Sequence, residues 1–179
     1  MKRSLIRMTV LLALMTLQAS ASGWATGDGS VYHKGDRLGS AGISFFFPGV
    51  LAAFDYGLHD CFSAGAATGY NVYSFSPQTL THHWPVMARV AFHPFNLKVL
   101  ADKIIIRNII DFYAGVSGGW IFRWDTYDFN IASKPDDHPS SFGVREYIGM
   151  RYYFKDNLAL FIEDCGDIST ISAGVTLLF

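Results

Sequence analysis

The sequence predicts an all-β fold, an eight-stranded antiparallel up-and-down transmembrane β-barrel. Half of the 179 residues are hydrophobic and 16% are aromatic, yet no stretch beyond the N-terminal leader has the length and freedom from charge of a spanning helix. The chain ends in STISAGVTLLF, where every second residue from Ile171 to Phe179 is apolar. A period of two is typical of a strand whose faces see different surroundings. Similar segments fill the chain, and a β-structure spans a bilayer only as a closed barrel.

The N-terminus has the features of a secretory signal peptide. A basic start is followed by an apolar run from Met8 to Leu17 and by the sequence Ala-Ser-Ala, which ends at Ala21. This order indicates export and cleavage after Ala21, whereas a buried N-terminal helix is the alternative. We therefore divide the chain into a signal peptide (1–21), an N-terminal lead-in (22–36) and an outer-membrane β-barrel (37–179).

Eight segments with alternating apolar residues are expected to form the strands. They are residues 37–47, 50–59, 62–73, 83–93, 109–124, 142–154, 158–165 and a last strand that ends at Phe179. With both barrel ends of the chain on the periplasmic side, the long connections after the third and fifth strands face outward. The connection 94–108 leaves two possibilities. Either it forms a short helix at the membrane surface, with Lys98, Lys103 and Arg107 near headgroups, or the fifth strand begins earlier, near Ile104.

The two faces of each strand differ in character. The apolar face is expected to meet lipid, although Glu146 falls on it. Aromatic residues near strand ends, such as Trp84 with Phe92, are typical of interfacial girdles and argue against a secreted lipocalin-like barrel. A polar network is expected in the barrel interior, and it comprises Asp55, Arg89, Asp111, Arg123, Arg145, Arg151 and Glu163. Because an eight-stranded barrel is only wide enough for side chains to fill, mutually paired charges are favoured over a hydrophilic channel.

Several stretches resemble the small, porin-like outer-membrane β-barrel proteins of Gram-negative bacteria. They are DYGLHDCFSAGAATGY, ARVAFHPF, DFYAGVSGGW, GMRYYFKDNLALFIEDCG and the closing SAGVTLLF. The resemblance implies an eight-stranded barrel in the cell outer membrane, in a group mostly of unassigned function. It also implies that Val175, Leu177 and Phe179 form a C-terminal insertion signal. The partners are then outer-membrane lipids and the barrel-insertion machinery.

The expected role is a non-catalytic one, as an envelope component, a platform for surface loops or a narrow pore. No catalytic, cofactor-binding or metal-binding residues are assigned, and no cofactor or external ligand is indicated. The formal net charge of −1 gives no sign of nucleic-acid binding. The alternative is a lipid-modifying enzyme, similar to lipid A deacylases, acting at the outer rim. His138 and Ser140 in the sequence HPSS, with Glu146 nearby, would be its candidate residues.

The two cysteines are expected to be unpaired. Cys61 follows the second predicted strand and Cys165 ends the seventh, so they lie at opposite rims of the barrel, roughly 25 Å apart. A disulfide needs Cα atoms within about 7 Å of each other. Of the two thiols, Cys165 is expected to be the more accessible from outside the cell.

Overall fold

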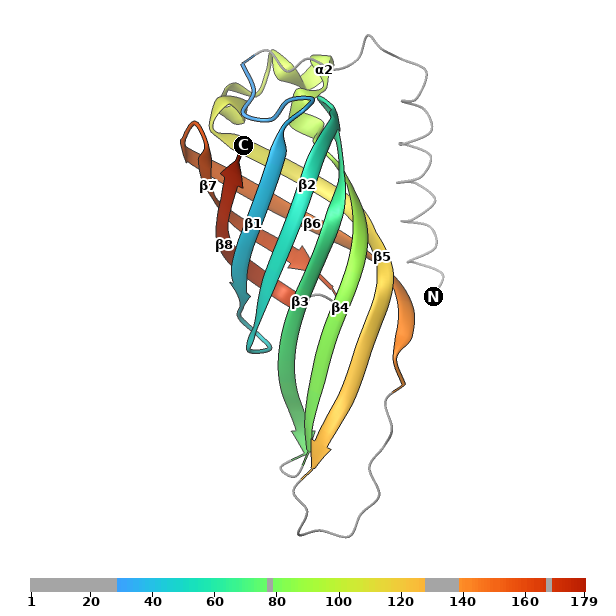
Figure 1. Ribbon diagram of the computed structural model, residues 1–179. Helices are drawn as coiled ribbons and strands as arrows, with labels where there is room; N and C mark the ends of the chain where they lie inside the picture. Colours follow the sequence, from blue (N-terminus) through green and yellow to red (C-terminus); the bar gives the residue numbers. More distant parts are fainter. Residues whose placement is uncertain (1–28, 77–78, 128–138, 167–168) are drawn as a thin grey trace.

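The computed structural model describes residues 29–76, 79–127, 139–166 and 169–179. In these residues eight strands form a closed barrel, in which each strand pairs antiparallel with its sequence neighbours and the last strand pairs with the first (Figure 1). The strands are β1 (Arg37–Ser44), β2 (Gly49–His59), β3 (Phe62–Ser76), β4 (Thr79–Phe92), β5 (Ile110–Tyr127), β6 (Ser141–Lys155), β7 (Leu158–Cys165) and β8 (Ser169–Leu178). The predicted fold class, strand number and strand order are confirmed. The predicted signal peptide lies outside the described residues.

The barrel has two unlike ends. At one, which we call the helical end, the connection between β4 and β5 lies close to the C-terminus (Figure 1). At the other, the extended end, β3, β4 and β5 project beyond the remaining strands (Figure 1). These three strands have 15, 14 and 18 residues, whereas β1 and β7 have 8 each.

The strand boundaries differ from the prediction mainly at the extended end. A polar loop was expected at 74–82, but β3 and β4 continue through most of it, with Tyr73 opposite Thr81. Likewise, β5 runs to Tyr127 instead of residue 124. Apolar alternation marks only the part of a strand with one apolar face, whereas backbone pairing continues where both faces are polar. Conversely, β1 ends at Ser44, because the apolar residues before Pro48 form a turn.

The connection between β4 and β5 is helical, so residues 94–108 do not contain an early start of the fifth strand near Ile104, and the expected position of this segment at the membrane surface stays a prediction. It contains a 3₁₀-helix η1 (Pro94–Asn96), a one-turn α-helix α2 (Lys98–Ala101) and a second 3₁₀-helix η2 (Ile105–Asn108). Strand β5 begins only at Ile110. Among the described residues, no helix has the length and apolar character needed to cross a membrane.

Side chains alternate between the outside and the interior as predicted. On the outside, apolar residues such as Val86, Met150 and Val175 are exposed, while in the interior Arg89 and Arg151 are buried. A slip of one residue would reverse this arrangement in any strand. The burial therefore confirms the predicted orientation and excludes a lipocalin-like barrel with an apolar interior facing a ligand.

Proline interrupts one of the ladders. Pro85 lies within β4, and the β3–β4 pairing stops at Thr68 opposite Val86 and resumes at Asn71 opposite His83. Proline has no backbone N–H to donate to the neighbouring strand. The hydroxyl of Thr68 donates to the Pro85 carbonyl oxygen at 2.8 Å, so this acceptor is paired although the backbone ladder is interrupted.

The cysteines are both free and buried. Cys61 lies in the turn between β2 and β3 at the helical end, and Cys165 ends β7 near the extended end, so the prediction of unpaired thiols is confirmed. The expected accessibility of Cys165 is wrong. Its side chain continues the inward-facing alternation of β7 and is 0% exposed.

We therefore expect neither thiol of the folded protein to react with a membrane-impermeant maleimide at pH 7. Burial, together with the neighbouring Asp60 carboxylate, raises the pKa of Cys61 to about 12, so the reactive thiolate is scarce at neutral pH. Mass spectrometry after labelling should show no adduct on folded protein and two after unfolding in urea. Rapid labelling of the folded protein that Cys165→Ser abolishes would contradict the observed burial.

Candidate functional site: a charge network across the barrel interior

Arg89 lies at the centre of the barrel interior and joins two distant strands. From β4, its Nε and Nη2 donate to the two carboxylate oxygens of Asp55 on β2, at 2.7 and 2.5 Å. Its Nη1 donates to Glu163 on β7 at 3.0 Å. Paired hydrogen bonds between guanidinium and carboxylate are among the strongest polar contacts in proteins. Arg89 thus links opposite walls of the barrel across the space between them.

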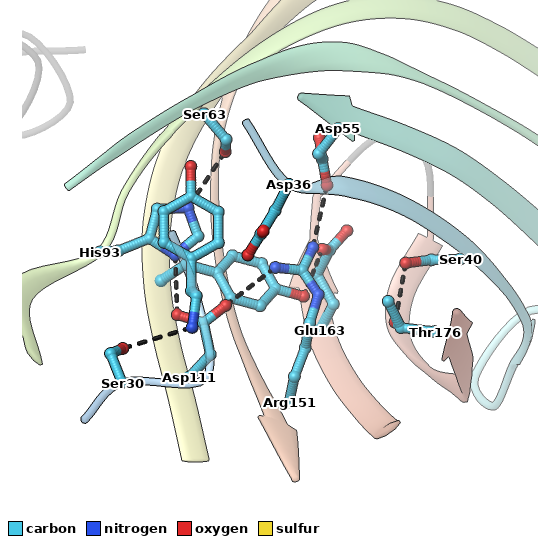
Figure 2. A network of polar contacts seen from close by, with 12 residues as sticks. Ser30, Asp36, Ser40, Asp55, Ser63, His93, Asp111, Arg151, Glu163 and Thr176 are labelled. Carbon is cyan, nitrogen blue, oxygen red and sulfur yellow. Dashed lines mark hydrogen bonds and ion pairs between the residues drawn. The ribbon is translucent and has the colours of Figure 1, made fainter. Parts of the chain in front are cut away.

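Arg151 on β6 extends this network toward β5. Its Nη2 donates to Asp55 at 2.9 Å, and its Nη1 donates to Asp111 on β5 at 3.0 Å. The guanidinium carbon also lies 4.1 Å from the ring centroid of Tyr113, a cation–π contact in a desolvated setting. Asp55 therefore binds both buried arginines, and Figure 2 shows the contacts of Arg151 with Asp55 and Asp111.

Two tyrosines complete the walls of the network. The hydroxyl of Tyr113 donates to Glu163 at 2.8 Å, and the ring centroid of Tyr147 lies 4.9 Å from the guanidinium carbon of Arg89. Each ring lies against a glycine of the neighbouring strand: Tyr113 over Gly149 and Tyr147 over Gly115. A Cβ atom at either glycine would overlap the ring, so these positions require the absence of a side chain.

A serine, a histidine and a carboxylate lie in line at the helical end of the network. His93 Nδ1 is 2.7 Å from Asp111 Oδ1, and His93 Nε2 is 3.1 Å from the Ser63 hydroxyl (Figure 2). These residue types and distances occur in hydrolases. Here, however, all three side chains are buried, and the ring of Tyr32 stacks on the imidazole at 3.7 Å. In this structure the Ser63 hydroxyl is therefore shielded from solvent, and the three buried polar groups are paired with one another.

Residues 29–36 of the N-terminal lead-in cover the helical end of the interior. Tyr32 is fully buried, its hydroxyl donates to the Phe62 carbonyl oxygen at 2.8 Å, and its own carbonyl oxygen accepts from Asn96 at 2.9 Å. The backbone beside it pairs with β2, where Gly35 donates to the Gly57 carbonyl oxygen at 2.8 Å. Burial holds the pKa of Tyr32 well above its usual range, so the phenol remains a hydrogen-bond donor.

Tyr32→Phe is expected to lower the free energy of unfolding by about 1 kcal/mol, the usual net value of one hydrogen bond. The substitution removes the bond to Phe62 but keeps the ring stacked on His93. Urea titration of the barrel refolded in liposomes measures the change. A loss as large as that of Tyr32→Ala would show that the hydroxyl, and not the ring, holds the lead-in.

The structure brings together five of the seven interior residues predicted from the sequence: Asp55, Arg89, Asp111, Arg151 and Glu163. The other two lie toward the extended end, apart from this cluster. Arg123 is half-buried and its backbone N–H donates to the Ser140 hydroxyl at 3.2 Å, while Arg145 is exposed.

The predicted insertion signal lies on the barrel surface. Val175, Leu177 and Phe179 are exposed on its outside. Of the residues considered for a rim enzyme, Glu146 is exposed, Ser140 is engaged by Arg123, and His138 lies outside the described residues. The structure therefore does not show these three residues together.

Five functional side chains were absent from the prediction: Tyr32, Ser63, His93, Tyr113 and Tyr147. The alternation already placed four of them, Ser63, His93, Tyr113 and Tyr147, on the inward face, so their position was available from the sequence. The lead-in carries no periodic signal, and the placement of Tyr32 on His93 depends on contacts between distant parts of the chain.

The network fills this level of the interior. Asp55, Arg89, Arg151 and Glu163 are each 1–2% exposed, so their charged groups are shielded from bulk solvent. Burial of a charge is costly unless the charge is paired, and here each carboxylate accepts from an arginine. Toward the extended end, Leu51, Ala67, Met87 and Ile121 fill the next layer. In the described part of the chain, no group of three or more metal-binding side chains occurs.

Comparison with protein families and with curated proteins finds no match. Comparison with solved structures finds similar proteins. The outer membrane protein OprG from Pseudomonas aeruginosa is similar with a TM-score of 0.57 and 11% sequence identity, over 84% of this chain and 99% of that one. This chain has the fold of a small outer-membrane β-barrel. The Yersinia pestis outer membrane protein Ail is similar with a TM-score of 0.48 and 10% identity, over 82% of this chain and 100% of that one.

Proposed function

We propose that this outer-membrane barrel is a closed, non-catalytic component of the bacterial envelope that presents its extended end outside the cell. The observation that carries the proposal is the buried network of Arg89 and Arg151 with Asp55, Asp111 and Glu163. A pore needs a continuous water path, whereas these side chains span the interior and are shielded from solvent at both ends. An enzyme needs a site that substrate can reach, and the set formed by Ser63, His93 and Asp111 is buried beneath Tyr32.

The exterior of the barrel supports the proposed orientation. Trp84 on β4 lies opposite Phe122 on β5, and both are exposed on the outside. Aromatic residues of this kind gather at the boundary between hydrocarbon and water. Beyond this pair the β4–β5 ladder continues to Thr79 opposite Tyr127, five residues further, or roughly 17 Å at the rise of a β-strand. The extended end thus stands above the membrane as a platform for surface loops.

The proposed partners are outer-membrane lipids and the barrel-insertion machinery. Val175 and Leu177 face outward on β8, and the backbone N–H of Phe179 donates to the Arg37 carbonyl oxygen at 2.9 Å. The C-terminal residue is therefore tied to β1 while its ring remains exposed. This arrangement suits a signal that is read during insertion, before β8 closes on β1.

Two measurements test the proposal. Cell fractionation with heat-modifiable gel migration should place a folded barrel in the outer membrane, and a soluble protein in the periplasm would refute the location. Mass spectrometry of lipid A from cells with and without the protein should give identical acylation. Loss of one acyl chain that depends on Ser140 and His138 would instead establish the lipid-modifying enzyme.

A further inference from the structure

We propose that the β4–β5 connection at the helical end, residues 94–109, binds the anionic phospholipid headgroups of the periplasmic leaflet. The inference rests on the proposed location in the outer membrane. The inference assigns a lipid-binding surface to a segment that has no part in the proposed function of a closed barrel. Three observations carry it: exposed apolar side chains, continuity with the apolar exterior of the barrel, and basic charge.

The segment exposes four large apolar side chains. Ile105 is 86% exposed and Val99 is 68% exposed, and Ile106 and Ile109 are exposed as well. Large contiguous apolar surface on a protein marks a site of contact with a partner or a membrane. These side chains therefore need a covering that the rest of the described chain does not provide.

The apolar surface continues that of the barrel exterior. The ring of Phe95 in η1 stacks on Phe112 of β5, with the ring centroids 5.8 Å apart. Phe112 lies opposite Met150 of β6 on the outward face, where the barrel meets lipid in the proposed orientation. Ile109 leads directly into β5. The connection thus lies where the acyl chains of the inner leaflet end and the headgroups begin.

The segment is also held in place by the barrel. Asn96 is buried, and its side-chain amide donates to the carbonyl oxygens of Tyr32 at 2.9 Å and Asp60 at 2.6 Å. The Arg107 carbonyl oxygen accepts from Val31 of the lead-in at 3.1 Å. These bonds fix the direction in which the exposed isoleucines point. A surface held in this way does not need to be ordered when lipid binds.

The charge of the segment selects the lipid. Residues 94–109 contain three basic residues and one acidic residue, in a chain whose formal net charge is −1. Lys98 and Lys103 are exposed beside the apolar residues. Apolar side chains flanked by lysines are typical of segments that lie in the interface of membranes with anionic lipids. The occupant is accordingly an anionic phospholipid, for which phosphatidylglycerol is the probe.

A spin label at Ile105→Cys tests the position of the segment. The native thiols are buried, so the wild-type protein should remain unlabelled and serves as the blank. In liposomes of phosphatidylcholine with phosphatidylglycerol, power saturation should show the label accessible to oxygen and protected from a water-soluble nickel complex. Asp156→Cys, exposed in the β6–β7 connection at the same end, should show the reverse. A label at Ile105 that is as accessible to nickel as the one at Asp156 overturns the inference.

A third label separates this inference from the proposed location. Leu160 is 52% exposed on the outside of β7, so a label at Leu160→Cys should lie in hydrocarbon. If this label is in water, the membrane location itself fails. If it lies in hydrocarbon while the label at Ile105 is in water, only the lipid surface fails.

Charge selectivity is tested with Lys98→Gln/Lys103→Gln. The preference of the protein for spin-labelled phosphatidylglycerol over phosphatidylcholine should fall by about twofold or more, since each lysine near the surface attracts anionic lipid. Lys155→Gln, an exposed lysine at the same end, should leave the preference nearly unchanged. An unaltered preference in the double variant overturns the assignment of anionic lipid.

Discussion

Arg89→Met is expected to lower the free energy of unfolding by about 3–5 kcal/mol, the cost of breaking a buried ion pair by removing one partner. Arg89 binds both Asp55 and Glu163. Without it, Asp55 keeps Arg151, but Glu163 loses its arginine partner and keeps neutral donors such as the Tyr113 hydroxyl. A buried carboxylate without a cationic partner is the origin of the large loss. Urea titration of the barrel in liposomes measures it.

Arg145→Met provides the matched control. Like Arg89, Arg145 belongs to the inward-facing set of its strand, but it lies toward the extended end and is exposed. Substitutions of exposed residues usually change stability by about 0.5 kcal/mol or less. Adding Glu163→Gln to Arg89→Met should recover part of the loss, because the uncompensated charge is removed. Equal effects of Arg89→Met and Arg145→Met would contradict the buried network.

Ile162→Arg is expected to cost about 2–4 kcal/mol, the cost of an arginine at mid-membrane on the lipid face of a barrel. Ile162 lies in the middle of β7, faces outward and is 48% exposed. The arginine would have to leave water for hydrocarbon. The same urea titration in liposomes measures the loss.

Leu80→Arg is the comparison. Leu80 is also 48% exposed, but it lies near the extended end of β4, beyond Trp84. There the arginine stays in water, so a change of about 1 kcal/mol or less is expected. If both substitutions cost the same, the outside of β7 does not face hydrocarbon.

The fold could be predicted because one constraint acts on almost every residue. The apolar surroundings of the barrel require alternate apolar side chains, and the closed sheet requires that each strand pair on both sides. The alternation also assigns Arg89 and Arg151 to the inward face of their strands and Val86 and Met150 to the outward face. It therefore identified the two arginines of the interior network. Arg145 follows the same alternation but lies too far toward the extended end to be buried. Alternation predicts on which face of the strand a side chain lies, but it predicts only roughly how far the residue lies from the end of the barrel.

The parts that could not be predicted depend on contacts between distant segments. Nothing local in the lead-in indicates that Tyr32 stacks on His93, since the two meet only once the barrel has closed. Cys165 was expected to be accessible because it lies at a rim, but the direction of its side chain decides its exposure. The extension of β3, β4 and β5 was missed because polar strands in water have no apolar face to reveal them.

Single-channel recording in planar bilayers tests the central claim, that paired charges close the barrel. Wild-type protein, with insertion verified by heat-modifiable migration, should give no large, steady conductance. Arg89→Met, which removes the side chain that spans the interior, should give more frequent and less stable current events than the wild type. A stable stepwise conductance of the wild-type protein, unchanged in Arg89→Met, would show an open water path and contradict the account.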